Sequence, residues 1–288
     1  MKLPKNKLYT ITTFAAMSLG ILVVLLAALG IKDDSTSSLA DPPESSEVVY
    51  DTCNTETELP EEENSIDNPL YQTENQMANP PGKVVYLTFD DGPCQHTEQL
   101  LNILDKYNAK VTFFVTNQAA PYKDMIGEAH RRGHTIAMHS YSHRFQDIYS
   151  SEEAYFEDLN KIQAICEAQT GVTPTIVRFP GGTSNRVSKK YCEGIMTVLS
   201  KSLTEKGYFY CDWNVDSGDA LDGATKESVT ERVIADIQTV SRPVVLMHDT
   251  YSYTVESIED ILIWGLSNGY TFLPLTEDSP MPHHNIMN

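Results

Sequence analysis

The chain has 288 residues, and its 40 acidic and 21 basic side chains give a formal net charge of −19 at pH 7. This length corresponds to one or two domains. A nucleic-acid-binding protein needs a basic surface to meet the phosphate backbone, so the charge argues against that class of function.

The first part of the chain contains an apolar segment at residues 8–31. It reads LYTITTFAAMSLGILVVLLAALGI, has no charged residue and follows three lysines. About 20 apolar residues cross the hydrocarbon core of a membrane, whereas a signal-peptide core has about 7–15. We therefore expect residues 1–31 to be a cytoplasmic basic end and a membrane anchor, with the rest of the chain outside. A cleaved signal peptide is the alternative, because ALG at 28–30 resembles a weak cleavage site.

Residues 32–80 form an acidic stretch with 13 Asp or Glu and a single basic residue, Lys32. The stretch has no apolar periodicity, and its composition is typical of a disordered segment. We expect a solvated tether through which a catalytic domain at residues 81–288 reaches a polymer outside the membrane. The expected location is the cell membrane, with a single span and an extracellular catalytic domain, or secretion if the first segment is cleaved.

From residue 83 onward, predicted strands and helices alternate. The expected strands are 83–89, 110–116, 134–140, 175–179, 208–213, 242–248 and 270–275. The expected helices are 96–107, 121–133, 151–170, 188–207, 226–240 and 255–269. Such alternation, about seven β/α units, predicts an α/β fold with a parallel sheet covered by helices. A barrel and an open doubly wound sheet both fit, although the first strand lacks a following GxGxxG turn, which weakens a dinucleotide-binding fold.

Polar side chains follow two of the early strands. Asp90 and Asp91, in TFDDGP, end the first strand, and His139 and His143, in HSYSH, end the third. Ligands bind at the carboxyl ends of parallel strands. TFDDGP alone favours an ordinary turn. Two histidines four residues apart face one way on a helical turn, however, and two imidazoles with a carboxylate form an open site for a divalent metal.

Further polar residues follow the later strands. Arg178 precedes the turn PGGTSN, Asp216 and Asp219 lie in DWNVDSGDA, and His248 follows PVVLM. Alone, Arg178 would be a surface ion-pair residue, and Asp216 and Asp219 would be loop acids. Asp249 is interpreted as a local cap. Their meaning therefore depends on the combination.

The five segments TFDDGP, HSYSH, RFPGG, WNVDSGDA and LMHD resemble, in this order, the motifs of the NodB-homology polysaccharide deacetylases, carbohydrate esterase family 4. The resemblance covers about residues 83–275 and, with the anchor, extends to membrane-anchored peptidoglycan N-deacetylases. It implies a deformed (β/α) TIM-like barrel and hydrolysis of N-acetyl groups on aminosugar polymers. It also implies one divalent metal ion, Zn²⁺, with Co²⁺, Mn²⁺ or Ni²⁺ as alternatives.

The resemblance implies a role for each matching residue. Asp91, His139 and His143 would hold the metal. Asp90 would be the general base that takes a proton from the activated water, and Arg178 would orient it. The two carboxylates of TFDDGP would thus divide the work, one on the metal and one on the proton.

The remaining matching residues would act on the leaving amine, the oxyanion and the sugar. His248 would be the general acid that protonates the leaving amine, with Asp219, or alternatively Asp216, keeping it charged. The backbone N–H of Gly181 would help to hold the oxyanion. Trp213 would either line the sugar site or belong to the core.

Amide hydrolysis needs these groups on chemical grounds. A metal lowers the pKa of water towards about 7, a carboxylate takes the proton, and a histidine paired with a carboxylate stays cationic near neutral pH. Backbone donors stabilise the developing oxyanion. Two departures from the family pattern affect the groove: Gly181 stands where an aromatic residue is frequent, and Ala220 stands where Trp frequently follows the acid.

The chain has five cysteines and no C-x-x-C pair, which disfavours a cysteine zinc site: Cys53, Cys94, Cys166, Cys192 and Cys211. Cys53 lies in the expected tether, so one or two disulfides, or buried thiols, remain open for the other four.

The sequence thus predicts a monomeric, membrane-anchored, metal-dependent N-deacetylase acting on peptidoglycan. One alternative is an esterase that removes O-acetyl groups from a glycan such as xylan, and another is a non-catalytic glycan-binding domain on the same fold. A glycosidase also needs two acids, but the adjacent Asp90 and Asp91 are a poor match for carboxylates placed across a scissile bond.

Overall fold

The computed structural model describes residues 82–288. Within this range no helix combines the length and the hydrophobicity that a membrane crossing requires. The expected anchor at 8–31 and the expected tether at 32–80 lie outside the described residues.

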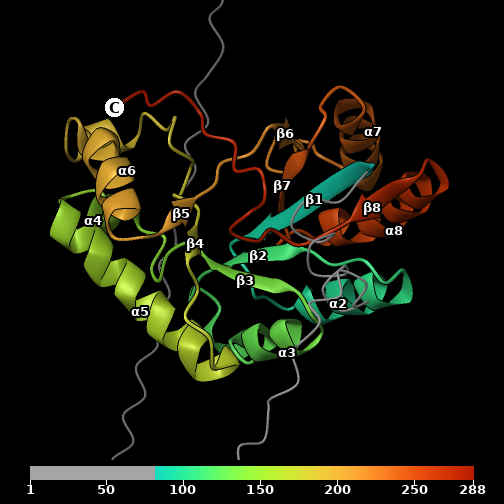
Figure 1. Cartoon of the computed structure of the whole chain (residues 1–288), viewed down its shortest axis with the longest axis horizontal. Coiled ribbons are helices and arrows are strands. Elements are labelled where there is room, and N and C mark those ends of the chain that lie inside the picture. Colours follow the sequence, from blue (N-terminus) through green and yellow to red (C-terminus); the bar gives the residue numbers. More distant parts are fainter. Residues whose placement is uncertain (1–81) are drawn as a thin grey trace, which may run out of the picture. The chain divides into compact units, whose positions relative to one another are not determined.

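Parallel strands form one curled sheet in the described part of the chain (Figure 1). They are β1 (Lys83–Asp90), β2 (Thr112–Val115), β3 (Thr135–Met138), β4 (Ile176–Val177), β5 (Phe209–Tyr210), β6 (Val215–Asp216), β7 (Val244–His248) and β8 (Tyr270–Phe272). Seven of them lie in the order β5-β4-β3-β2-β1-β7-β6, and β8 pairs with the first three residues of β1. This half-barrel confirms the predicted α/β fold with a deformed TIM-like barrel.

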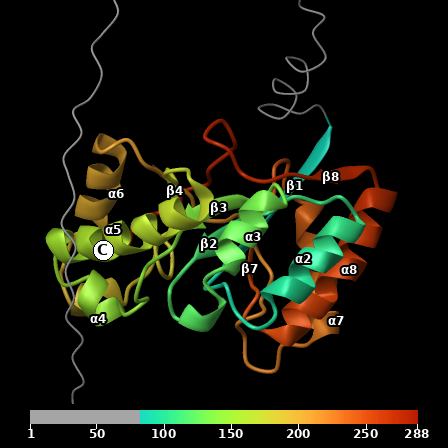
Figure 2. The same ribbon diagram turned by 90° about the horizontal axis from the view of Figure 1, so that it is seen from below.

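Helices cover the outside of the curled sheet (Figures 1 and 2). They are α2 (Thr97–Lys106), α3 (Met125–Arg131), α4 (Phe145–Ile148), α5 (Glu152–Thr170), α6 (Ile195–Glu205), α7 (Lys226–Ile237) and α8 (Ser252–Ser267). Short 3₁₀ turns occur at Ala120–Tyr122 and Ser188–Lys190, where the sequence predicted the first turns of longer α-helices. The strand β6 and the helix α4 were not predicted.

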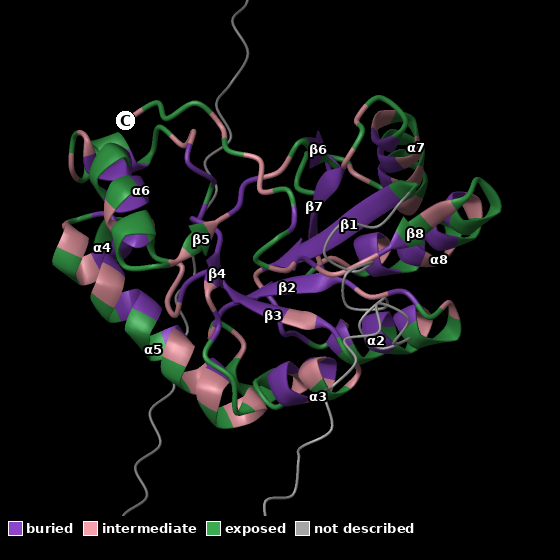
Figure 3. Cartoon of the chain, viewed as in Figure 1, coloured by how far each residue is buried: buried purple, intermediate pink, exposed green. Residues whose placement is uncertain are grey.

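The burial pattern explains why these segments form these elements. All residues of β1 after Lys83 are buried, as expected for a central strand with neighbours on both edges. The helices are buried only on the side that faces the sheet (Figure 3). Side chains at the helix starts satisfy free backbone N–H groups: Ser151 accepts from Ala154 N, and Thr225 forms a capping box with Ser228.

The strand register brings distant polar residues together at the carboxyl end of the sheet. Asp90 pairs with His248 across β1 and β7. Met138 pairs with Val177 across β3 and β4, so the next residues, His139 and Arg178, also leave the sheet side by side.

The four cysteines of the described region are free thiols, and three of them are buried: Cys94, Cys166 and Cys211, with Cys192 partly exposed. The alternative of buried thiols therefore holds there. Burial raises the pKa of Cys166 to about 12 and that of Cys211 to about 11, which keeps both protonated and unreactive.

Candidate active site and metal centre

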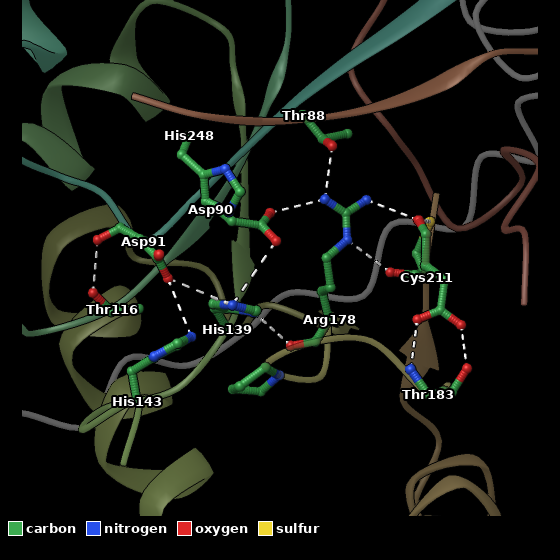
Figure 4. Close-up of polar contacts among 12 residues, drawn as sticks. Thr88, Asp90, Asp91, Thr116, His139, His143, Arg178, Thr183, Cys211 and His248 are labelled. Carbon is green, nitrogen blue, oxygen red and sulfur yellow. Dashed lines mark hydrogen bonds and ion pairs between the residues drawn. The ribbon is translucent and has the colours of Figure 1, made fainter. Parts of the chain in front are cut away.

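Asp91, His139 and His143 converge at the carboxyl end of the sheet (Figure 4). Asp91 Oδ1 lies 3.6 Å from His139 Nε2 and 3.3 Å from His143 Nε2. One ligand atom from each residue lies within 4.8 Å of the other two. Two separate segments of the chain thus supply one carboxylate and two imidazoles to a single point.

Two loops in unusual backbone conformations hold these side chains. Asp91 has a φ of +73°, and the turn after it is fixed because Thr116 donates from Oγ1 to the carbonyl of Asp91 and from its N–H to that of Gly92. His143 has a φ of +52°, which is uncommon for a residue with a side chain. The prediction that HSYSH is a helical turn is therefore wrong, since these residues form an irregular loop and α4 begins only at Phe145.

The three residues fit a divalent metal ion. Ligands at zinc distances of 2.0–2.2 Å in a tetrahedron lie roughly 3.4 Å from one another, close to the spacing seen here. Asp91 Oδ1 is buried and has no hydrogen-bond partner among residues 82–288, so the site leaves it free to bind a cation. His139 Nδ1 lies 2.7 Å from the carbonyl oxygen of Arg178, which fixes the proton on Nδ1 and points the lone pair of Nε2 at Asp91. Burial lowers the pKa of His139, which favours the neutral, ligating form.

Asp90 lies beside this cluster and is held by Arg178 (Figure 4). Arg178 Nη1 donates to Asp90 Oδ1 at 2.8 Å and to Thr88 Oγ1 at 2.7 Å. The other oxygen of Asp90, Oδ2, lies 3.8 Å from His139 Nε2, so it faces the metal cluster. The guanidinium also donates to the carbonyls of Cys211 and Asp212. One carboxylate oxygen is thus fixed by the protein, and the other is directed at the site.

His248 lies beside Asp90, its register partner on β7, and is paired with Asp219. Its Nδ1 lies 2.9 Å from Asp219 Oδ1, and its backbone N–H donates to Asp219 Oδ2 at 2.6 Å. Thr254 Oγ1 and the backbone N–H of His248 both donate to Oδ2 of Asp219, so the carboxylate of Asp219 cannot rotate freely. Asp216 has a different partner, because its Oδ1 accepts from Gly218 N–H. Of the two acids left open by the sequence, Asp219 is therefore the one in contact with His248.

The pairing changes the protonation of His248. Burial lowers the pKa of this imidazole, but the hydrogen bond and the charge of Asp219 outweigh burial and raise the pKa to about 9. The charges of Asp90 and Asp91 add to the rise. The imidazole is therefore protonated at neutral pH, as a general acid must be.

Gly181 lies in the loop after β4 with a φ of +76°. A Cβ there would come within 3.2 Å of Asn185 Cβ and of Phe145 Cζ, so a larger residue would be strained in its backbone and would press on both neighbours. No hydrogen bond within residues 82–288 engages its N–H, which leaves the donor free for a substrate oxygen. Trp213 is half-buried; it packs against Gly182 and lies edge-on to His284. Its role in sugar binding stays a prediction.

The sequence did not predict the role of Asp212, and the role predicted for Asp249 differs from the one observed. Asp212 is buried, and its carboxylate accepts from Thr183 N–H, Thr183 Oγ1 and His284 N–H, which ties the loop after β4 to the C-terminal segment. Its place in DWNVDSGDA was the only signal. The interpretation of Asp249 as a local cap is wrong, because its Oδ2 accepts from Thr97 Oγ1 at the start of α2.

Comparison with known proteins finds one family model and several relatives. Residues 77–195 match the polysaccharide deacetylase family model. A peptidoglycan-N-acetylglucosamine deacetylase of Bacillus cereus is 31% identical over 207 residues, which cover 69% of this chain and 72% of that protein. The crystal structure of the catalytic domain of a peptidoglycan N-acetylglucosamine deacetylase from Eubacterium rectale is 53% identical, with a TM-score of 0.72, and covers 73% of this chain and 96% of that one. The polysaccharide deacetylase Bc1974 from Bacillus cereus is 28% identical, with a TM-score of 0.60, and covers 72% and 100%.

Proposed function

The chain belongs to the polysaccharide deacetylase family, and from this membership and the site geometry we propose that it hydrolyses the N-acetyl groups of N-acetylglucosamine residues in peptidoglycan. The observation that carries the proposal is the cluster of Asp91, His139 and His143, with Asp90 facing it and the Asp219–His248 pair next to Asp90. The predicted divalent metal suits this donor set.

Two residues, Asp90 and His248, carry out the two proton transfers of the reaction. A divalent ion bound by Asp91, His139 and His143 supplies Lewis-acid chemistry, which polarises the acetyl carbonyl and makes water easier to deprotonate. Asp90 takes the proton from water as the water oxygen attacks the carbonyl carbon. Arg178 holds Asp90 through Oδ1, so Oδ2 is the oxygen that accepts this proton.

Breaking the amide bond needs a proton on the departing nitrogen. His248 gives that proton as the C–N bond breaks, so the amine leaves neutral, and the acetic acid formed loses its proton to solvent as acetate. Asp219 keeps the imidazole protonated and turns Nε2 towards the site, because Nδ1 is already engaged. The free N–H of Gly181 donates to the acetyl oxygen as negative charge develops on it.

The choice of peptidoglycan rests on the relatives and on the N-terminal sequence. Two of the relatives carry the name peptidoglycan N-acetylglucosamine deacetylase. We further propose that residues 8–31 anchor the chain in the membrane and that the enzyme works as a monomer outside the cell on the wall. Loss of acetyl groups would leave free amines on the wall polymer.

Acetate release from purified peptidoglycan by the full chain tests the proposal. We expect release that stops with a chelator and returns with Zn²⁺, and that falls about 10²- to 10⁴-fold in Asp90→Asn and in His248→Ala. Both variants should keep the metal content of the unchanged protein. Acetate released from acetylated xylan but not from peptidoglycan would reassign the protein as an O-acetyl esterase, and binding without release would make it a glycan-binding domain.

A further inference from the structure

Asp158 is a carboxylate on the buried face of a helix. It lies in α5 and is only 9% exposed, with Tyr155, Leu159, Ile162 and Cys166 as the other buried residues of this helix. No Lys, Arg or His within residues 82–288 forms an ion pair with it. A buried carboxylate is costly unless hydrogen bonds satisfy it, so its partners explain its presence.

Within residues 82–288, the carboxylate of Asp158 accepts three hydrogen bonds, and all three come from the loop between the two metal-cluster histidines. Oδ2 accepts from Ser140 Oγ and from Tyr141 N–H, both at 2.6 Å. Oδ1 accepts from Ser142 N–H at 3.0 Å. The loop that joins His139 to His143 thus winds around this one carboxylate.

Ser140 extends the arrangement to the second histidine. Its Oγ donates to Asp158 and accepts from the backbone N–H of His143 at 2.9 Å. His143 has the positive φ described above, a conformation that persists only where its surroundings impose it. The hydrogen bond from His143 N–H to Ser140 Oγ, with that Oγ held by Asp158, supports this backbone conformation.

The two histidines differ in their support. His139 directly follows β3, and its ring is fixed by the carbonyl of Arg178. His143 follows an irregular loop instead of a strand, and its backbone N–H donates to Ser140 Oγ within that loop. Loss of the Asp158 carboxylate should therefore displace His143 and leave His139 largely in place.

We propose that Asp158 is a positioning residue of the metal centre, which sets the place of His143 through the Ser140–Ser142 loop. This inference rests on the proposed function, because it presumes that His143 binds the metal. Its consequence is specific: Asp158 contributes to metal affinity only as long as His143 is a ligand. Partners of metal ligands typically contribute about 10- to 100-fold to metal affinity.

The test measures Zn²⁺ affinity of the full chain by competition with a chromogenic chelator. We expect Asp158→Asn to bind Zn²⁺ about 10- to 100-fold more weakly. The matched control is Glu157→Gln, which removes one negative charge from the exposed neighbouring position of the same helix and should leave the affinity unchanged. Ser140→Ala should also weaken binding while the Asp158 carboxylate remains, and it serves if Asp158→Asn does not fold.

A double-mutant cycle separates positioning from general destabilisation. In the His143→Ala background, Asp158→Asn should weaken Zn²⁺ binding no further, because the ligand it positions is already gone. An equal loss with and without His143, or an unchanged affinity in both Asp158→Asn and Ser140→Ala, would overturn the inference alone. A starting protein that binds no Zn²⁺ would overturn the proposed function and the inference together.

Discussion

Arg178 has no solvent-exposed surface, and each of its guanidinium nitrogens donates a hydrogen bond. Its planar group also lies over the ring of Phe114, with 4.0 Å from Cζ to the centroid. Lysine would keep the charge but could not reach all these acceptors, because its ammonium is a single point on a flexible stem. The orientation of Asp90 therefore depends on the shape of the arginine as well as on its charge.

Replacement of Arg178 by Lys should lower both stability and activity. Each buried acceptor left without a donor costs about 1–3 kcal/mol, so we expect the free energy of unfolding to fall by about 2 kcal/mol or more. Urea unfolding of the variant checks this, with Arg144→Lys as the control, because Arg144 is 63% exposed and should change by less than about 0.5 kcal/mol. Equal unfolding free energies for Arg178→Lys and the unchanged protein would show that the branched guanidinium of Arg178 does not contribute to stability.

The pH dependence of acetate release reports on His248. The imidazole is an acid only when protonated, so activity should fall as pH rises through its pKa. We expect this alkaline limb of the pH–activity profile between about 6.5, the ordinary pKa of histidine, and about 9, the raised pKa of His248. The pKa falls within this interval because a bound metal cation near Asp90 and Asp91 cancels the part of the rise that these two carboxylates cause.

In Asp219→Asn the limb should move to lower pH, since the charge that raises the pKa of His248 is gone. The maximal rate should also fall, by about 10²-fold. Asp216→Asn is the matched control, because it removes a loop acid of the same segment that does not contact His248. A limb that stays in place in Asp219→Asn would contradict the pairing.

Among the elements, those with a strong apolar pattern could be predicted from the sequence. The buried run of β1 and the apolar face of α5 identify a strand and a helix without other information. The two-residue strand β6 has too few side chains to show a pattern. The conformation of HSYSH could not be predicted either, because groups of this loop donate hydrogen bonds to Asp158, a residue of the next long helix.

The packing of α8 on β8 gives a test at this scale. A Cβ on Gly265, within α8, would lie 2.4 Å from Phe272 Cζ of β8. Alanine favours a helix over glycine by about 1 kcal/mol, but overpacking of a full core contact costs about 1–3 kcal/mol. We expect Gly265→Ala to be destabilising in urea unfolding, whereas Ser267→Ala, at the exposed end of the same helix, should be neutral or slightly stabilising.

On the scale of the whole molecule, the site is assembled from the ends of β1, β3, β4 and β7 and from the loop after β6. The positions of Asp91, His139, His143 and His248 could be predicted because motifs at strand ends converge in a parallel fold. The supporting acid Asp158 could not, since it lies in no motif, and the place of Asp212 in DWNVDSGDA does not show which groups donate to its carboxylate.

Location is a property of the whole chain and is tested by fractionation. If residues 8–31 are an anchor, the full chain should remain in the membrane fraction after a high-salt wash and should be degraded by external protease in intact cells. Recovery of a shortened chain from the medium would instead show that the segment is a cleaved signal peptide.

The central claim is that Asp91, His139 and His143 share one ion, and anomalous diffraction at the zinc absorption edge from crystals grown with Zn²⁺ tests it most directly. We predict a single strong anomalous peak within about 2.0–2.2 Å of Asp91 Oδ1, His139 Nε2 and His143 Nε2. A peak bound elsewhere, or none at these three atoms at saturating Zn²⁺, would contradict the account.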